Sequence, residues 1–296
     1  MANQITDQEI QRQQAVQNTI DAKVKAHQAL TDSDIEFICP VAFKQTLSKQ
    51  EKANLGLSKH YSFVPTSSVI NDLRTLGWNP VDAVQVKARK KETNGYQKHM
   101  VTFENDSYKT EGATEYPQLL LTNSHDGGNA FTLSAGIFRL VCSNGLVIKT
   151  EDYGTSRLVH KGYSFEAIQD LVNNFVATID ETLTRITAMK EIELNRDQQM
   201  EFAKAAALLR FTEKSYNEEN IDKVLDLDDL LNAERAEDKG NGLWEVYNRV
   251  QESLVQGKFH YVGGNKKSRK ARPIKNFKQS IDVNKKLSEL AFAYVA

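Results

Sequence analysis

The stretch "LLLTNSHDGGNAFTLSAGIFRLVCSNGLVI" (residues 119–148) gives the clearest indication of the fold. Apolar runs flank the short segment "HDGG" (125–128), whose two glycines permit the backbone angles of a tight turn. The pattern predicts one strand over "PQLLLTNS" (117–124) and a second over "NAFTLSAGIF" (129–138), joined at that turn. We therefore expect an antiparallel sheet at the centre of the fold.

Further strand pairs are expected on both sides of this one. Asn94-Gly95 is a strong hairpin signal between "VDAVQVKARKK" (81–91) and "YQKHMVTFEN" (96–105). A third pair is predicted from "NGLVIKT" (144–150) and "SRLVHKGY" (156–163). The β-rich part of the chain should therefore end near residue 163.

Helical spacing of apolar residues marks the remaining elements. A helix is predicted in "VPTSSVINDLRTLGW" (64–78), where Gly77 ends it. Residues 164–212 contain neither Gly nor Pro and predict one long helix, or two that break near "ELNRDQQ" (193–199). An amphipathic helix should begin at Leu243 and end at Gly257, and a last helix should cover 281–296.

These elements predict an α+β fold, with an antiparallel β-rich N-terminal half followed by long helices. The expected segments are a polar helical N-terminal arm (1–58), a β-rich core with one helix (59–162), a long helical segment with an acidic loop (163–240), and C-terminal helices with a basic loop (241–296).

Bulk composition narrows the class of protein. The 296 residues are 40% hydrophobic and 26% charged, with a net charge of −1, which is typical of a globular chain in water. Cys39 and Cys142 form no disulfide framework, the N-terminus is Gln-rich, and no apolar run is long enough for a membrane helix. We expect a cytoplasmic protein without a membrane partner. Because no phosphate-binding loop, dinucleotide fingerprint or zinc-protease motif is present, we expect no cofactor and no enzymatic activity.

The "HDGG" segment permits two interpretations. His125 and Asp126 could be metal ligands or an acid–base pair, or the segment could only connect two strands. The other histidines are scattered singly, and none lies at the spacing that a zinc site needs, so the sequence favours the turn and no metal site. A metal-dependent nuclease using His125 and Asp126 is the least favoured hypothesis. Cys142 follows two apolar residues and is expected to be a buried side chain rather than a nucleophile.

Two clusters of Lys and Arg give the strongest chemical signal. One lies in "GGNKKSRKARPIKNFKQ" (263–279), which contains no acidic residue, and the other ends at the first hairpin turn. Such clusters neutralise nucleic-acid phosphates, and Tyr96, Phe103, Tyr261 and Phe277 are available to stack on bases. The alternative is a solvated surface, or docking onto the acidic stretch 213–238. The predicted nucleic-acid-binding residues are Lys87, Arg89, Lys90, Lys91, Lys266, Lys267, Arg269, Lys270, Arg272, Lys275 and Lys278.

Several long motifs together resemble one known family. They are "YSFVPTSSVINDLRTLGW" (61–78), "YQKHMVTF" (96–103), the opening stretch 119–148, "SRLVHKGY" (156–163) and "GLWEVYNRVQESLVQG" (242–257). The chain resembles the phage- and plasmid-like family called domain of unknown function 932. The resemblance implies a protein of a mobile element acting in a bacterial host cell. The motif residues whose role it leaves unknown are His125, Asp126, Gly127, Arg139, Asn144 and Gly145.

The predicted order of elements adds a weaker similarity. A helix that ends in Gly77-Trp78, followed by a basic hairpin, more strands and a long helix, is similar to the core of ring-forming single-strand annealing proteins. Those proteins bind DNA in a positively charged groove between a sheet and helices. The similarity implies a homo-oligomer that binds single-stranded DNA in replication, recombination or annealing. The alternative hypothesis is an anti-defence protein, which would bind and block a host restriction or immunity factor through its polar N-terminal helix or its acidic stretch.

Overall fold

The computed structural model describes residues 7–58, 61–88, 90–109, 115–128, 131–139, 156–158, 164–211, 217, 219–262 and 267–295. The chain divides into two compact units. The first, here called the sheet unit, comprises 1–135 and 152–176, and the second, the helical unit, comprises 136–151 and 177–296.

A five-stranded sheet with the order β1-β2-β3-β4-β5 is the centre of the β-rich half. β1 pairs with β2, β2 with β3, and β4 with β5, each time antiparallel. The α+β prediction, an antiparallel sheet followed by helices, is therefore confirmed. The strands are β1 (Asn79–Gln85), β2 (His99–Glu104), β3 (Glu115–Asn123), β4 (Phe131–Arg139) and β5 (Ser156–Leu158).

One detail of the strand prediction is wrong. β1 ends at Gln85 and not at residue 91, and a short 3₁₀ helix (Lys91–Thr93) leads into the turn at Gly95, where φ is +87°. The exposed lysines after Gln85 offer no apolar face that a sheet could bury, which explains the early end of the strand. β5 pairs with β4. Its predicted partner 144–150 lies outside the described residues, so that strand pair stays a prediction.

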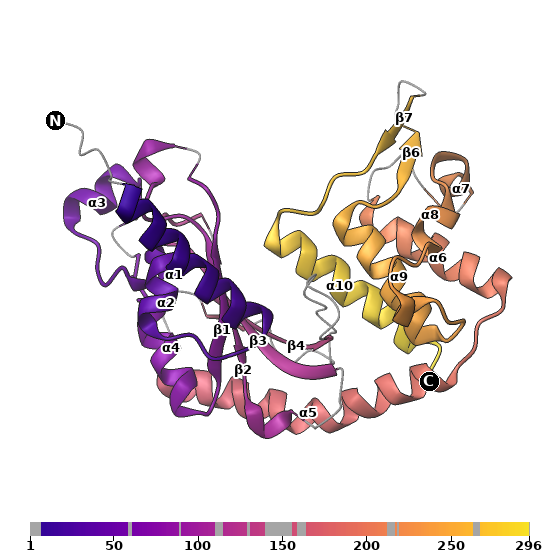
Figure 1. Cartoon of the computed structure of the whole chain (residues 1–296), viewed down its shortest axis with the longest axis horizontal. Coiled ribbons are helices and arrows are strands. Elements are labelled where there is room, and N and C mark those ends of the chain that lie inside the picture. The colour runs from indigo at the N-terminus through magenta and orange to yellow at the C-terminus, as the bar shows by residue number, and fades with distance from the viewer. Residues whose placement is uncertain are drawn as a thin grey trace. The chain divides into compact units, whose positions relative to one another are not determined.

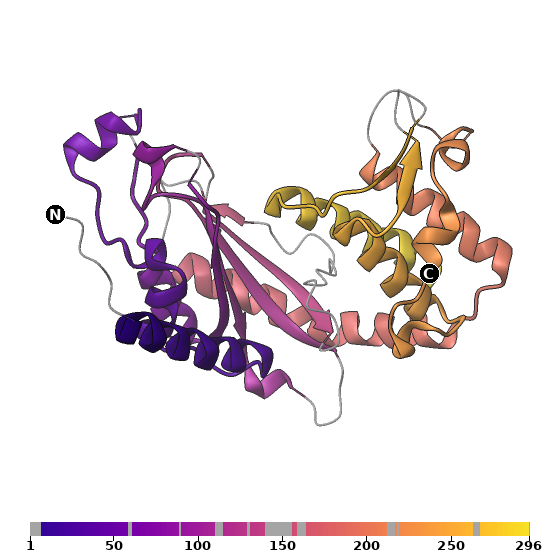
Figure 2. The same ribbon diagram turned by 45° about the horizontal axis from the view of Figure 1, so that its top comes forward.

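Helices cover the sheet within the sheet unit. α4 buries Val69, Ile70 and Leu73 at helical spacing, and its Thr66 reaches His99 on β2. Figures 1 and 2 show α1, α2 and α4 grouped beside the strands. The helices of this unit are α1 (Asp7–Lys25), α2 (Asp32–Ile38), a 3₁₀ helix (Pro40–Phe43), α3 (Lys49–Asn54), α4 (Thr66–Thr75), a second 3₁₀ turn (Asp106–Tyr108) and the first part of α5 (Phe165–Glu191).

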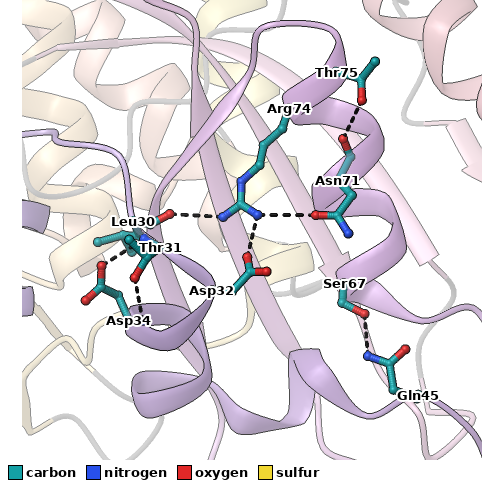
Figure 3. A network of polar contacts seen from close by, with 9 residues as sticks. All are labelled: Leu30, Thr31, Asp32, Asp34, Gln45, Ser67, Asn71, Arg74 and Thr75. Carbon is teal, nitrogen blue, oxygen red and sulfur yellow. Dashed lines mark hydrogen bonds and ion pairs between the residues drawn. The ribbon is translucent and has the colours of Figure 1, made fainter.

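A polar network fixes the segment before α2 to α4 (Figure 3). The guanidinium of Arg74 donates to the carbonyl oxygen of Leu30 at 3.1 Å and to the carboxylate of Asp32 at 2.5 Å. Thr31 and Asp34 complete a capping box at the start of α2, which satisfies backbone donors that the helix leaves unpaired. Arg74 therefore joins two helices that lie far apart in the sequence.

The helical unit is built around α9 (Leu243–Gln256), most of whose side chains are buried. Trp244 and Tyr247 stack with ring centroids 5.6 Å apart, and Val250 and Leu254 continue the same core. The other elements are the rest of α5, α6 (Arg196–Arg210), α7 (Ile221–Val224), α8 (Leu227–Leu231), a 3₁₀ turn (Ala236–Asp238), the ribbon of β6 (His260–Val262) and β7 (Ser268–Lys270), and α10 (Phe277–Phe292).

The sequence left open whether residues 164–212 form one helix or two, and the structure contains two. α5 ends at Glu191, and Asn195 begins α6 with a reciprocal capping box to Gln198. The polar residues of "ELNRDQQ" thus provide the start of a new helix. No helix in the described part of the chain is long and apolar enough to cross a membrane.

The described part of the basic segment, 267–279, contains regular structure where the sequence predicted a loop. Arg269 and Lys270 lie in β7, which pairs with β6 in a two-stranded ribbon. The last helix begins at Phe277 rather than at residue 281, because the side chain of Asn276 accepts a hydrogen bond from the backbone of Gln279 and caps it. Some of the basic residues therefore lie in a strand or a helix rather than in a loop.

We predict that Thr66→Val lowers the free energy of unfolding by about 1–3 kcal/mol, because it leaves buried polar partners unsatisfied. The Thr66 hydroxyl lies 2.8 Å from Nε2 of His99 and accepts a hydrogen bond from Asn123 at 3.0 Å. Thr75→Val is the matched control on the same helix, since the Thr75 hydroxyl bonds only the carbonyl of Asn71 and is exposed. Chemical denaturation should show an effect below about 0.5 kcal/mol for the control. Equal losses in the two variants would contradict the prediction.

Candidate nucleic-acid interface

The "HDGG" segment forms a bend between β3 and β4. Gly127 has a φ of +73°, and the backbone N–H of Gly128 donates to Oδ1 of Asp126 at 2.9 Å. A Cβ atom on Gly127 would lie 2.5 Å from Cδ2 of Leu57, so both the backbone angle and the space favour glycine. The arrangement accounts for Asp126 and Gly127 as residues of a strand connection.

His125 is fully buried next to a second histidine. Its ring lies 5.2 Å from that of His99 and 4.5 Å from that of Phe63. Nδ1 of His99 lies 3.1 Å from the carbonyl oxygen of Gln97, and burial lowers the pKa of His99 to about 4, so this ring is neutral at pH 7. The pair could not be predicted from local sequence patterns, because it depends on the register that places His99 opposite Asn123 at the end of β3.

His125 and Asp126 belong to no larger cluster of possible metal ligands within the described residues. Among the residues that the structure describes, no three His, Cys, Asp or Glu side chains are grouped so that they could hold an ion. Arg139 is the last residue of β4, but the position of its side chain is not described. Cys142, Asn144 and Gly145 lie outside the described residues. His125 lies in a packed core, where its ring contacts those of His99 and Phe63.

The basic residues predicted from the sequence are distributed over both units. Lys87, Lys90 and Lys91 are exposed on the sheet unit, between β1 and β2. Lys267, Arg269, Lys270, Arg272 and Lys275 are exposed on the helical unit. Lys278 lies on α10 but its side chain is outside the description, and Arg89 and Lys266 are outside it altogether.

An open groove of about 770 Å³ lies on the helical unit. It brings together three of the predicted basic residues, Arg269, Lys270 and Arg272, and the aromatic candidate Tyr261. Arg210, Phe211 and Gln279 also line it and were not expected from the sequence. Arg210 lies in the last turn of α6, where a cation commonly interacts with the helix dipole. The sequence therefore contains no pattern that would mark Arg210 as a residue of a binding site. We call these seven residues and Ala271 the basic groove.

A close approach of two backbone segments shapes the basic groove. Gly257 ends α9 with a φ of +67°, and a Cβ there would lie 2.6 Å from the carbonyl carbon of Arg272 and 2.8 Å from the carbonyl oxygen of Ala271. The N–H of Ala271 donates to the carbonyl of Phe259 at 2.9 Å, and that of Ile274 donates to the carbonyl of Val255 at 2.8 Å. The chain after β7 is therefore fastened along the end of α9, and only glycine fits at the crossing.

Arg210 fixes the same crossing from the side of α6. Its guanidinium donates to the carbonyl oxygens of Leu254 and Arg272, and it lies 5.1 Å from the ring centroid of Phe259. Burial lowers the pKa of Arg210, although a guanidinium keeps its charge at any pH that proteins tolerate. Arg210 thus adds a fixed positive charge to the groove and holds the backbone of Arg272 in place.

Four of the exposed cations on this surface have no acidic partner in the part of the chain that the structure describes. Within the described residues, Arg269, Lys270, Arg272 and Lys275 take part in no ion pair. Three acids of the described part of the acidic stretch 213–238 pair with other side chains: Asp228 with Arg196, Asp229 with His260, and Glu234 with Lys258. The surface therefore presents a concentrated positive charge to an external anion.

Comparison with known proteins agrees on one family. A profile of the family described as Domain of unknown function (DUF932) matches residues 56–288. The UPF0380 protein YafZ of Escherichia coli (strain K12) is 29% identical over 234 residues, which cover 79% of this chain and 80% of the relative. The UPF0380 protein YfjQ of the same organism is 28% identical over the same shares. No solved structure matches the chain.

We predict that Gly257→Ala destabilises the basic groove by more than the cost of placing alanine at a positive φ. The added methyl group must displace the backbone of Ala271 and Arg272, and such overpacking costs about 1–3 kcal/mol. Hydrogen exchange should detect faster exchange at the amides of Ala271 and Ile274, whose bonds fasten the crossing.

Gly56→Ala is the matched control for this variant. Gly56 has nearly the same φ, +66°, but nothing lies within 4 Å of a Cβ added there. It should therefore show only the cost of the left-handed conformation, about 1–2 kcal/mol, with unchanged exchange at Ala271 and Ile274. If both variants leave exchange at those two amides unchanged, the close approach does not fix the groove.

Proposed function

The chain belongs to the family described as domain of unknown function 932, and we propose that it binds single-stranded DNA through the basic groove of its helical unit. The observation that supports this most is a set of exposed cations without ion pairs, placed around an open groove that also has an aromatic wall. Cations neutralise the phosphate backbone, and aromatic rings accept unpaired bases.

The charge pattern favours a polyanion over an acidic protein surface. Arg269, Arg272 and Lys270 follow one another on β7 and the segment after it, so their spacing is that of an extended chain. A nucleic-acid strand presents phosphates at regular intervals along its length, and every cation that meets one releases condensed counterions. Lys275 and Lys267 extend the same run on either side.

In this proposal the protein is a DNA-binding component of a mobile element, which acts as an oligomer in annealing, recombination or replication. Lys87, Lys90 and Lys91 on the sheet unit would contribute a second set of phosphate contacts. The anti-defence hypothesis remains the alternative. It predicts a retained host protein in a pull-down after nuclease treatment, and no binding to an isolated oligonucleotide.

A salt series on labelled single-stranded DNA tests the proposal. A plot of the logarithm of the binding constant against the logarithm of the salt concentration should be a straight line. Its slope should be about −0.7 for each phosphate contact. Combining Arg269→Ala, Lys270→Ala and Arg272→Ala should reduce that slope by about 2, since three contacts are lost. Fluorescence anisotropy at several salt concentrations measures both quantities.

Lys286→Ala provides the matched control, because Lys286 is an exposed lysine of α10 that does not line the groove. Its slope should equal that of the unmodified protein. The proposal fails if no binding occurs at low salt, or if the triple variant keeps the full slope while circular dichroism shows it folded.

A further inference from the structure

Three aromatic rings form a cluster at the wall of the basic groove. The ring of Phe211 lies 5.9 Å from that of Phe259 and 5.5 Å from that of Tyr261. Phe259 is fully buried and its ring packs against that of Phe211, whereas Phe211 and Tyr261 are half-buried and line the groove. Backbone pairing of Tyr261 with Arg269 on β7, and a bridge to Leu225, hold this wall in place.

The groove combines this wall with charge and a neutral hydrogen-bonding group. Arg269, Lys270 and Arg272 line it together with the two half-buried rings, and Gln279 adds a side-chain amide that can both donate and accept. Its volume of about 770 Å³ is in the range of sites that enclose small molecules, and is far too small for a duplex. The chemistry on its walls matches the two halves of a nucleotide, a flat base and a charged phosphate.

Base pairing determines whether the bases of a nucleic acid can stack on these aromatic rings. In a duplex the faces of the bases are covered by their neighbours, so a protein ring can stack only on a base that is unpaired and unstacked. Phosphate contacts alone make no such distinction, since both single and double strands carry them. An aromatic wall beside a row of cations would therefore add a requirement for an exposed base.

We propose that the basic groove holds an unpaired nucleotide, with its base stacked on Phe211 or Tyr261 and its flanking phosphates on Arg269, Lys270 and Arg272. This inference rests on the proposed function and specifies how the strand is engaged. It assigns the preference for single strands to the aromatic wall and the salt dependence to the cations. Affinity should then depend on the presence of bases at constant charge.

The test compares an oligo(dT) strand with an abasic strand of the same length and phosphate number. Loss of one stacked base should weaken binding roughly five- to 150-fold at constant salt. Equal affinity of the two strands for the unmodified protein would overturn the inference, and a persisting salt slope would then leave the proposed function standing. Absence of binding to both strands would overturn the two together.

Variants of the wall assign the effect to these rings. Tyr261→Phe keeps the flat ring and should keep the preference for oligo(dT) over the abasic strand. Phe211→Leu combined with Tyr261→Leu removes the rings and should bring the ratio of the two affinities close to one, with an unchanged salt slope. A ratio that stays high in the folded double variant would place the stacked base elsewhere and overturn the inference.

Discussion

The close approach of Gly257 to the backbone of Ala271 and Arg272 is the constraint on which the candidate interface depends. It lets the chain after β7 run along the end of α9, where the carbonyls of Val255 and Phe259 accept its amide hydrogens. The guanidinium of Arg210 joins the same two segments from α6. One backbone crossing thus holds the cations on and after β7 beside the aromatic rings of Tyr261 on β6 and Phe211 after α6.

In the sheet unit, a network of buried polar side chains joins α4 to the central strands. His99, His125 and Asn123 meet at one end of β2 and β3, where Thr66 of α4 bonds both His99 and Asn123. Because these groups are buried, each hydrogen bond is costly to remove, and the network specifies the register of the two strands. The "HDGG" turn that begins at His125 is accordingly part of the architecture, and the chemistry of phosphate binding is proposed for the other unit.

Local patterns predicted the elements well, because they act over a few residues. Apolar spacing located α4, the helices of 164–212 and α9, and glycines located the turns at Gly95 and Gly127. The polar residues near Asn195 indicated the break between α5 and α6. The basic groove was only partly predictable. Its cations stand out in the sequence, but Arg210 reaches carbonyls 44 and 62 residues away, and no local pattern encodes that packing. The His99–His125 pair likewise requires knowledge of strand register.

The central claim is that a single strand lies in the basic groove with a base against its aromatic wall. Ultraviolet cross-linking of an oligonucleotide that carries 5-iodouracil, followed by mass spectrometry of the linked peptide, tests this directly. Iodouracil links most efficiently to an aromatic ring on which it stacks, so the cross-link should occur at Phe211 or Tyr261. Cross-links confined to the hairpin of the sheet unit, at or near Tyr96, would contradict the account.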